Sequence, residues 1–174
     1  MPTTFQSETA VAGCIDAIRR ALELTEPLDD ATYTFAPEGH GSVGEHLRHS
    51  IDHFDCFFRD IESGTINYDA RSRSHEVEVN CAAARVVLDE ILHGLERLST
   101  RSLQRAIRIR QTAAPGEPPI EMESSIDREL VFLSGHMVHH LALMVLIAER
   151  TGASPSTELG VAYSTAAFRA GRTA

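Results

Sequence analysis

Apolar residues recur every three or four positions in four long stretches of the chain, a pattern typical of helices with one buried face. The stretches cover about residues 5–26, 42–62, 78–99 and 124–150. Pro27 ends the first stretch, and Ser42 with Glu45 forms the capping-box pattern at the start of the second. The pattern therefore predicts four long amphipathic helices.

The segment between the third and fourth predicted helices has a different pattern. Ile107 and Ile109 precede the turn-rich run AAPGEPP, Ile120 and Met122 follow it, and all four alternate with polar residues. Alternation around a turn predicts a small β-hairpin within residues 104–123. After the fourth helix, the segment LGVAYSTAAF predicts one or two further helical turns.

Length and composition agree with this pattern. The chain has 174 residues, of which 43% are apolar, enough for one domain with a sizeable core. We therefore predict an all-α fold in a single domain, residues 1–174: a four-helix bundle with a small β-hairpin between the third and fourth helices. With 16 basic and 25 acidic residues, the net charge is -9 and no basic stripe is present. This balance predicts no nucleic-acid partner.

The sequence also predicts location and association. The N-terminus MPTTFQSETA lacks the features of a secretory signal, which predicts a cytoplasmic protein. The longest apolar run, residues 141–148, is far shorter than a membrane span, so no membrane association is expected. The same run is apolar on every side, which predicts a helix at the centre of the bundle or shared with a second copy in a homodimer. Cys14, Cys56 and Cys81 are widely spaced, as expected of reduced, buried thiols, although Cys56 lies near a histidine stripe.

Six of the nine histidines fall in two short windows, GEHLRHSIDH and GHMVHH. In the second window His136 and His140 are one helical turn apart on the same face, so two imidazoles can meet one cation. His139 lies about 100° away around the helix and points elsewhere. Imidazole nitrogen suits Zn, Ni, Cu or Fe. The pair therefore suggests a metal site.

The first window strengthens this hypothesis. His46, His49 and His53 form a single stripe of the second predicted helix. A third ligand from this helix would complete a three-histidine site with open coordination positions, the arrangement of a catalytic metal. The alternative is that these histidines line a solvated groove or bond buried carbonyls.

With these residues the chain resembles the DinB-like or YfiT-like metalloproteins. The resemblance rests on VGEHLRHSIDHF, NYDARSRSHEVE and RELVFLSGHMVHHLALM, which stand in the family's order and together anchor most of the chain. It implies a four-helix bundle with a three-histidine metal centre. In this bundle His49 from the second helix joins His136 and His140 from the fourth, and His46 and His53 are neighbours.

One position departs from the family. An Arg often follows soon after the second histidine of the pair, but Leu141 and Ala142 stand there in this chain. A substrate role of such an Arg therefore does not carry over.

The resemblance also implies a reaction class. Members of the family include bacillithiol transferases and mycothiol-dependent maleylpyruvate isomerase. A divalent metal, Zn or Ni foremost, can bind a low-molecular-weight thiol as thiolate, or activate water for hydrolysis. We therefore expect a metal-dependent, thiol-using transferase or isomerase acting on a small molecule, with no catalytic base assigned. The alternatives are a metal-dependent hydrolase, a metal- or ligand-binding protein without catalysis, and a structural bundle with incidental histidines.

Other polar residues are weaker candidates for contact with substrate. Tyr68, Arg71 and Arg73 follow the second predicted helix and can receive a carboxylate or phosphate. Pairing of these Arg residues with Glu76, Glu78 or other acidic residues, which would fix the loop, is the favoured alternative.

Glu129 stands seven residues before His136 and so lies on nearly the same helical stripe. There it can orient a ligand or act as a base. A capping or surface role is the favoured expectation for this carboxylate.

Overall fold

The computed structural model describes residues 4–98, 103 and 105–172. The chain is mostly helical, with one small three-stranded sheet. In chain order the elements are α1 Thr4–Thr25, α2 Asp30–Thr34, α3 Val43–Asp60, η1 Ile61–Ser63, β1 Thr65–Asn67, α4 His75–Val79, α5 Cys81–Glu96, β2 Ala106–Gln111, β3 Ile120–Ser125, α6 Ile126–Glu149, η2 Thr157–Gly160 and α7 Tyr163–Arg172.

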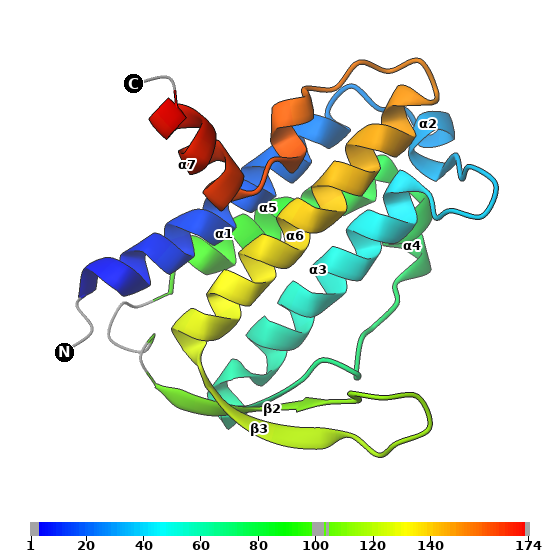
Figure 1. Cartoon of the computed structure of the whole chain (residues 1–174). Helices are drawn as coiled ribbons and strands as arrows, with labels where there is room; N and C mark the ends of the chain where they lie inside the picture. The colour runs from blue at the N-terminus through cyan, green and yellow to red at the C-terminus, as the bar shows by residue number, and fades with distance from the viewer. Residues whose placement is uncertain (1–3, 99–102, 104, 173–174) are drawn as a thin grey trace.

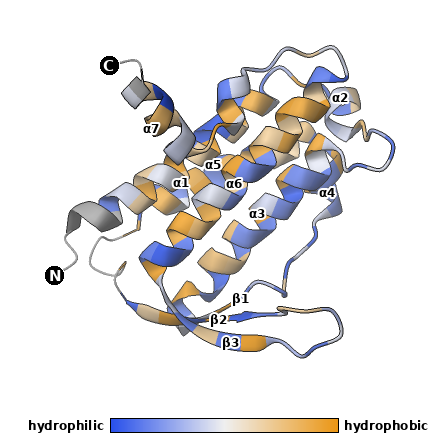
Figure 2. Cartoon of the chain, viewed as in Figure 1, coloured by the Kyte–Doolittle hydropathy of each residue, from blue (hydrophilic) through white to orange (hydrophobic). Residues whose placement is uncertain are grey.

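Four long helices build the core. Each of α1 and α3 packs against both α5 and α6, and Figure 1 shows α3 and α6 running side by side. Figure 2 shows hydrophobic and hydrophilic residues alternating along these helices, as amphipathic packing requires. Side chains buried in this core come from all four helices and include Ile18, Phe54, Leu88 and Leu133.

Local signals set where the helices begin. The Ser42 hydroxyl accepts a hydrogen bond from the Glu45 amide at 3.0 Å, and the Glu45 carboxylate accepts one from the Ser42 amide at 2.7 Å. The predicted capping box is thus confirmed. Ser125 caps α6 in the same way, since its hydroxyl accepts from the Arg128 amide.

The third predicted helix differs from the structure. Instead of one helix over residues 78–99, α4 ends at Val79 and α5 begins at Cys81. Asn80 between them is extended, and its side chain accepts a hydrogen bond from the Ala83 amide at 2.9 Å. An Asn side chain competes in this way with helical backbone bonding and restarts the helix. The predicted end at residue 99 lies outside the described residues.

The sheet is larger than predicted. Strands β2 and β3 pair antiparallel, with Ile109 opposite Met122. Strand β1 adds to β2 in parallel, with Ile66 opposite Ile109. Three residues are too few for an alternating pattern, so the sequence did not indicate β1. The sheet lies across one end of α3 and α6 (Figure 1), and the predicted hairpin start at residue 104 lies outside the described residues.

Two features of the chain bear on its surroundings. By length and composition alone α6 could cross a membrane, although the uninterrupted apolar run inside it is short. Half of its most apolar window is buried inside the protein (50%), as in the core helix of a soluble protein. Cys14, Cys56 and Cys81 are free and buried.

Gly44 supplies a test of the packing around α3. A Cβ at this position would overlap the Glu78 carbonyl oxygen and lie 2.7 Å from Cε1 of Tyr33, whereas a Cβ at Gly135 of α6 would meet nothing within 4 Å. We expect Gly44→Ala to lower the free energy of unfolding by about 1–3 kcal/mol, the usual effect of overpacking. Gly135→Ala should be neutral or stabilise by up to about 1 kcal/mol. Urea denaturation of both variants checks this, and equal stability of the two would contradict the packing described.

Candidate metal centre

Three imidazoles from two adjacent helices converge between α3 and α6. His49 comes from α3 and His136 and His140 come from α6, and one possible ligand atom of each lies within 4.8 Å of the others. The His136 and His140 ring centroids are 4.6 Å apart, and that of His49 lies 5.1 and 4.8 Å from them. The packing of α3 on α6 thus brings together the three residues that the resemblance implied.

The chemistry of this cluster fits a divalent cation. His136 Nε2 is buried and has no hydrogen-bond partner among the described residues. A buried polar nitrogen without a partner is unfavourable, and coordination to a metal would satisfy it. Three neutral imidazoles are a donor set used by Zn²⁺ and other first-row ions. His49, His136 and His140 can therefore hold one metal ion.

Burial keeps these imidazoles neutral. It is the main cause that lowers the pKa of His49 to about 4 and those of His136 and His140 to about 3, and neighbouring histidines lower them further. All three side chains are thus unprotonated at one ring nitrogen at neutral pH, the form that binds a metal.

Two further histidines surround the three. His46 Nδ1 lies 3.0 Å from His140 Nδ1, so one of these nitrogens donates and the other accepts. His53 Nδ1 donates to the backbone oxygen of His49 at 2.8 Å, and its ring centroid is 4.5 Å from that of His136. His139 is exposed and meets the cluster only where its ring stands edge-on to His140. The bond to a backbone oxygen fixes the tautomer of His53, whereas the bond between His46 and His140 fixes only how the two rings lie.

The loop after β1 is fastened to α3 by a buried carboxylate. Asp52 accepts hydrogen bonds from the Ser72 hydroxyl at 2.8 Å and from the Arg73 amide at 3.2 Å. Arg48 bridges Asp52 at 3.0 Å and Glu78 at 2.6 Å. Asp52 is not among the site residues predicted from the sequence, and its i, i+4 spacing from Arg48 is the signal that pointed to it.

The two Arg residues of this loop differ in their surroundings. Arg71 Nη1 donates to His49 Nδ1 at 2.7 Å, whereas the Arg73 side chain is exposed. Within the described part of the chain, neither side chain forms an ion pair with Glu76, Glu78 or another carboxylate, so the favoured alternative is wrong. Arg73 has a left-handed backbone with a φ of 53°, and its amide donates to Asp52 of α3.

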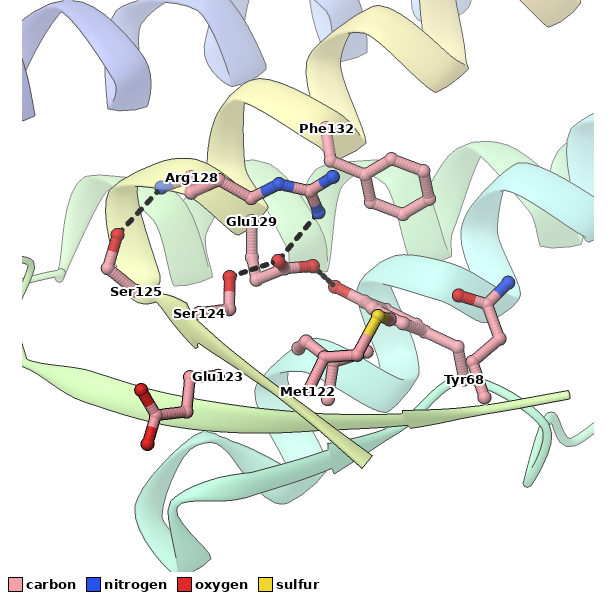
Figure 3. Close-up of a pocket in the computed structure, with 10 residues that line it drawn as sticks. Tyr68, Met122, Glu123, Ser124, Ser125, Arg128, Glu129 and Phe132 are labelled. Carbon is pink, nitrogen blue, oxygen red and sulfur yellow. Dashed lines mark hydrogen bonds and ion pairs between the residues drawn. The ribbon is translucent and has the colours of Figure 1, made fainter. Parts of the chain in front are cut away.

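Glu129 is fully buried, so the expected capping or surface role is wrong (0% exposed). Its carboxylate accepts hydrogen bonds from Tyr68 at 2.9 Å, Ser124 at 2.6 Å and Arg128 at 2.7 Å, as Figure 3 shows. Burial, with the adjacent Glu129, raises the pKa of Tyr68, whose hydroxyl therefore stays protonated and donates. Tyr68 thus bonds Glu129 and does not join the two Arg residues of the loop.

Two cavities lie near the imidazoles. One of about 490 Å³ is lined by Met122, Arg128 and Phe132 among others (Figure 3), and the Phe132 ring stacks on His136 with centroids 5.5 Å apart. The second, of about 750 Å³, is mostly apolar and reaches His46. Both have the size of small-molecule sites.

Comparison with known proteins gives a family match. The model of the DinB superfamily matches residues 15–144, more than half of the chain and a range that includes all three imidazoles. A protein of Rhizopus delemar named FK506-binding protein 5 is 32% identical over 101 residues, which cover 58% of this chain. They cover 26% of that protein, so the chain spans about a quarter of its length. No solved structure matches the chain significantly.

The lowered pKa values predict a stability that depends on pH in the metal-free protein. In the unfolded chain these histidines gain protons near pH 6.5, but in the folded chain only near pH 4 to 3. Protonation then favours the unfolded chain, so stability is fully present above pH 6.5 and falls as the pH drops toward 3.

Urea denaturation at pH 7.5 and pH 5.0, with a chelator present, measures this loss. His136→Gln removes one of the three groups and should reduce the loss by up to about 1 kcal/mol per pH unit, after allowance for solvent screening. An identical pH dependence in both proteins would contradict the expectation.

Proposed function

The chain belongs to the DinB superfamily, and from this premise we propose that it is a metal-dependent enzyme acting on a small molecule. His49, His136 and His140 would hold one divalent ion, Zn²⁺ or Ni²⁺, within a DinB-type four-helix bundle made by α1, α3, α5 and α6. The observation that carries the proposal is the buried, unpartnered His136 Nε2 beside two other neutral imidazoles.

The proposed chemistry is thiol-dependent transfer or isomerisation. Three protein ligands leave a coordination position at which the ion, when bound, would stabilise a thiolate and so make a low-molecular-weight thiol nucleophilic. The protein would supply orientation. His140 can coordinate through Nε2 if its Nδ1 carries the proton and donates to His46 Nδ1, 3.0 Å away.

The surroundings support a small substrate. One cavity is lined by Phe132, whose ring stacks on His136, and the apolar cavity is lined by His46, whose ring contacts His140. Glu129 does not serve as the base in this proposal, because its two carboxylate oxygens already accept hydrogen bonds from three side chains. The base stays unassigned.

Association and location are proposed on simpler grounds. Leu146 of α6 is 59% exposed and Val131 is 60% exposed, which supports a homodimer that covers this helix. The net charge of -9 supports the absence of a nucleic-acid partner. We propose a cytoplasmic enzyme with no membrane partner, in keeping with the half-buried α6.

Metal content tests the proposed site. Protein purified without a histidine tag or chelator should contain about one metal ion per chain by elemental analysis. His49→Ala, His136→Ala and His140→Ala should each weaken Zn²⁺ binding by more than about 100-fold, since removing a ligand exceeds the effect of removing its hydrogen-bond partner. His139→Ala is the matched control from the same motif and should bind normally. Wild-type protein that binds no metal after reconstitution would overturn the proposal.

Activity separates the reaction classes. The metal-loaded protein is expected to consume a low-molecular-weight thiol together with an electrophile, and His136→Ala should lose this activity. Product release without any thiol would indicate hydrolysis instead. If the fully metal-loaded protein shows no turnover in either assay, the protein binds metal without catalysis and the proposed enzymatic function is wrong.

A further inference from the structure

Arg71 forms a hydrogen bond with His49, one of the proposed metal ligands. Its Nη1 lies 2.7 Å from His49 Nδ1. A guanidinium has N–H donors and no acceptor, so Arg71 donates and His49 Nδ1 accepts. A neutral imidazole has one lone pair and one N–H, and the N–H of His49 is therefore on Nε2.

This hydrogen bond and coordination of His49 exclude each other. If Nδ1 were the ligand atom, the ion would take the lone pair that Arg71 uses. If Nε2 were the ligand atom, the proton would move to Nδ1, and Nδ1 could no longer accept a hydrogen bond from Arg71. Either ligand atom therefore releases the guanidinium.

The released guanidinium stays close to the imidazoles. The loop backbone on its carboxyl side is fixed to α3, because Asp52 accepts hydrogen bonds from Ser72 and Arg73. Arg71 Nε is already buried without a hydrogen-bond partner in the part of the chain that the structure describes. After release, a second nitrogen of the same group would lack a partner, which is unfavourable for a charged side chain.

The carboxylates nearby are already engaged. Asp52 and Glu78 share Arg48, and Glu129 is held by three donors. A guanidinium beside a divalent cation is also repelled by it unless negative charge lies between them. An anion from outside the chain would supply both the missing acceptor and the negative charge between the two cations.

We propose, on the basis of the metal site above, that Arg71 and the metal ion compete for His49, and that the released Arg71 binds a carboxylate of the substrate. A planar carboxylate can accept two parallel hydrogen bonds from a guanidinium, whose geometry it matches. Metal and carboxylate then favour each other's binding. The metal frees Arg71 to bind the carboxylate, and the carboxylate gives the freed guanidinium a partner.

Co²⁺ is the probe for the test, since its visible absorption reports coordination by the full-length, tag-free protein. Affinity is measured with and without acetate for wild type, Arg71→Gln, Arg71→Lys and Arg73→Gln. Arg73→Gln is the matched control, because it removes the same charge from the same loop at an exposed side chain.

Without acetate, Arg71→Gln should bind Co²⁺ about tenfold more tightly than wild type, because the competing charged hydrogen bond is gone. Acetate should tighten Co²⁺ binding severalfold in wild type and have little effect in Arg71→Gln. Arg71→Lys keeps a charged donor and should behave like wild type without acetate, with a weaker response to acetate. Arg73→Gln should match wild type in both conditions.

Two results would overturn the inference, and they differ in what else they affect. Equal Co²⁺ affinities and equal acetate responses in wild type, Arg71→Gln and Arg73→Gln would overturn the role of Arg71 and leave the metal site intact. Absence of Co²⁺ binding by wild type would overturn the proposed function and this inference together. A cooperative thermal unfolding transition shows that each variant is folded. If Arg71→Gln does not fold, the weaker acetate response of Arg71→Lys still tests the inference.

Discussion

The packing of α3 against α6 is the constraint on which the rest of the site depends. Leu47 and Phe54 of α3 and Met137 and Leu141 of α6 are buried, and the histidines of the site stand among these apolar positions. Apolar contacts of this kind fix the register of two helices. A slip by one helical turn, about 5.4 Å, would separate imidazoles that now lie in reach of a single ion.

Burial of that contact explains the electrostatics around it. The same exclusion of water that stabilises the core keeps the imidazoles neutral, and it requires every buried carboxylate to have donors. Asp52 and Glu129 both meet this requirement. Asp52 accepts hydrogen bonds from the loop after β1, and Glu129 accepts them from Tyr68 and Ser124. The two acids thus fasten the loop and the sheet to the helices that carry the histidines.

Helical periodicity in the sequence predicted which histidines share a face. It could not predict features that depend on contacts between residues far apart in the chain. One helical stripe relates His46, His49 and His53, and one turn separates His136 from His140, so their faces follow from sequence spacing. Glu129 lies on the same kind of stripe, yet its burial depends on Tyr68, which is 61 residues away in the chain. Strand β1 likewise exists only through its pairing with β2, and three residues have no pattern of their own.

The three central imidazoles differ in the hydrogen bonds that they make. His136 Nε2 has no hydrogen-bond partner among the described residues, and the bond between His46 and His140 can run in either direction, since each ring can donate or accept. Neither needs to lose a partner before coordinating. His49 differs, because Arg71 can only donate and so fixes one tautomer. The pair on α6 can therefore coordinate a metal without losing a hydrogen bond. Coordination by His49 on α3 instead breaks its bond to Arg71, in the loop that Asp52 holds in place.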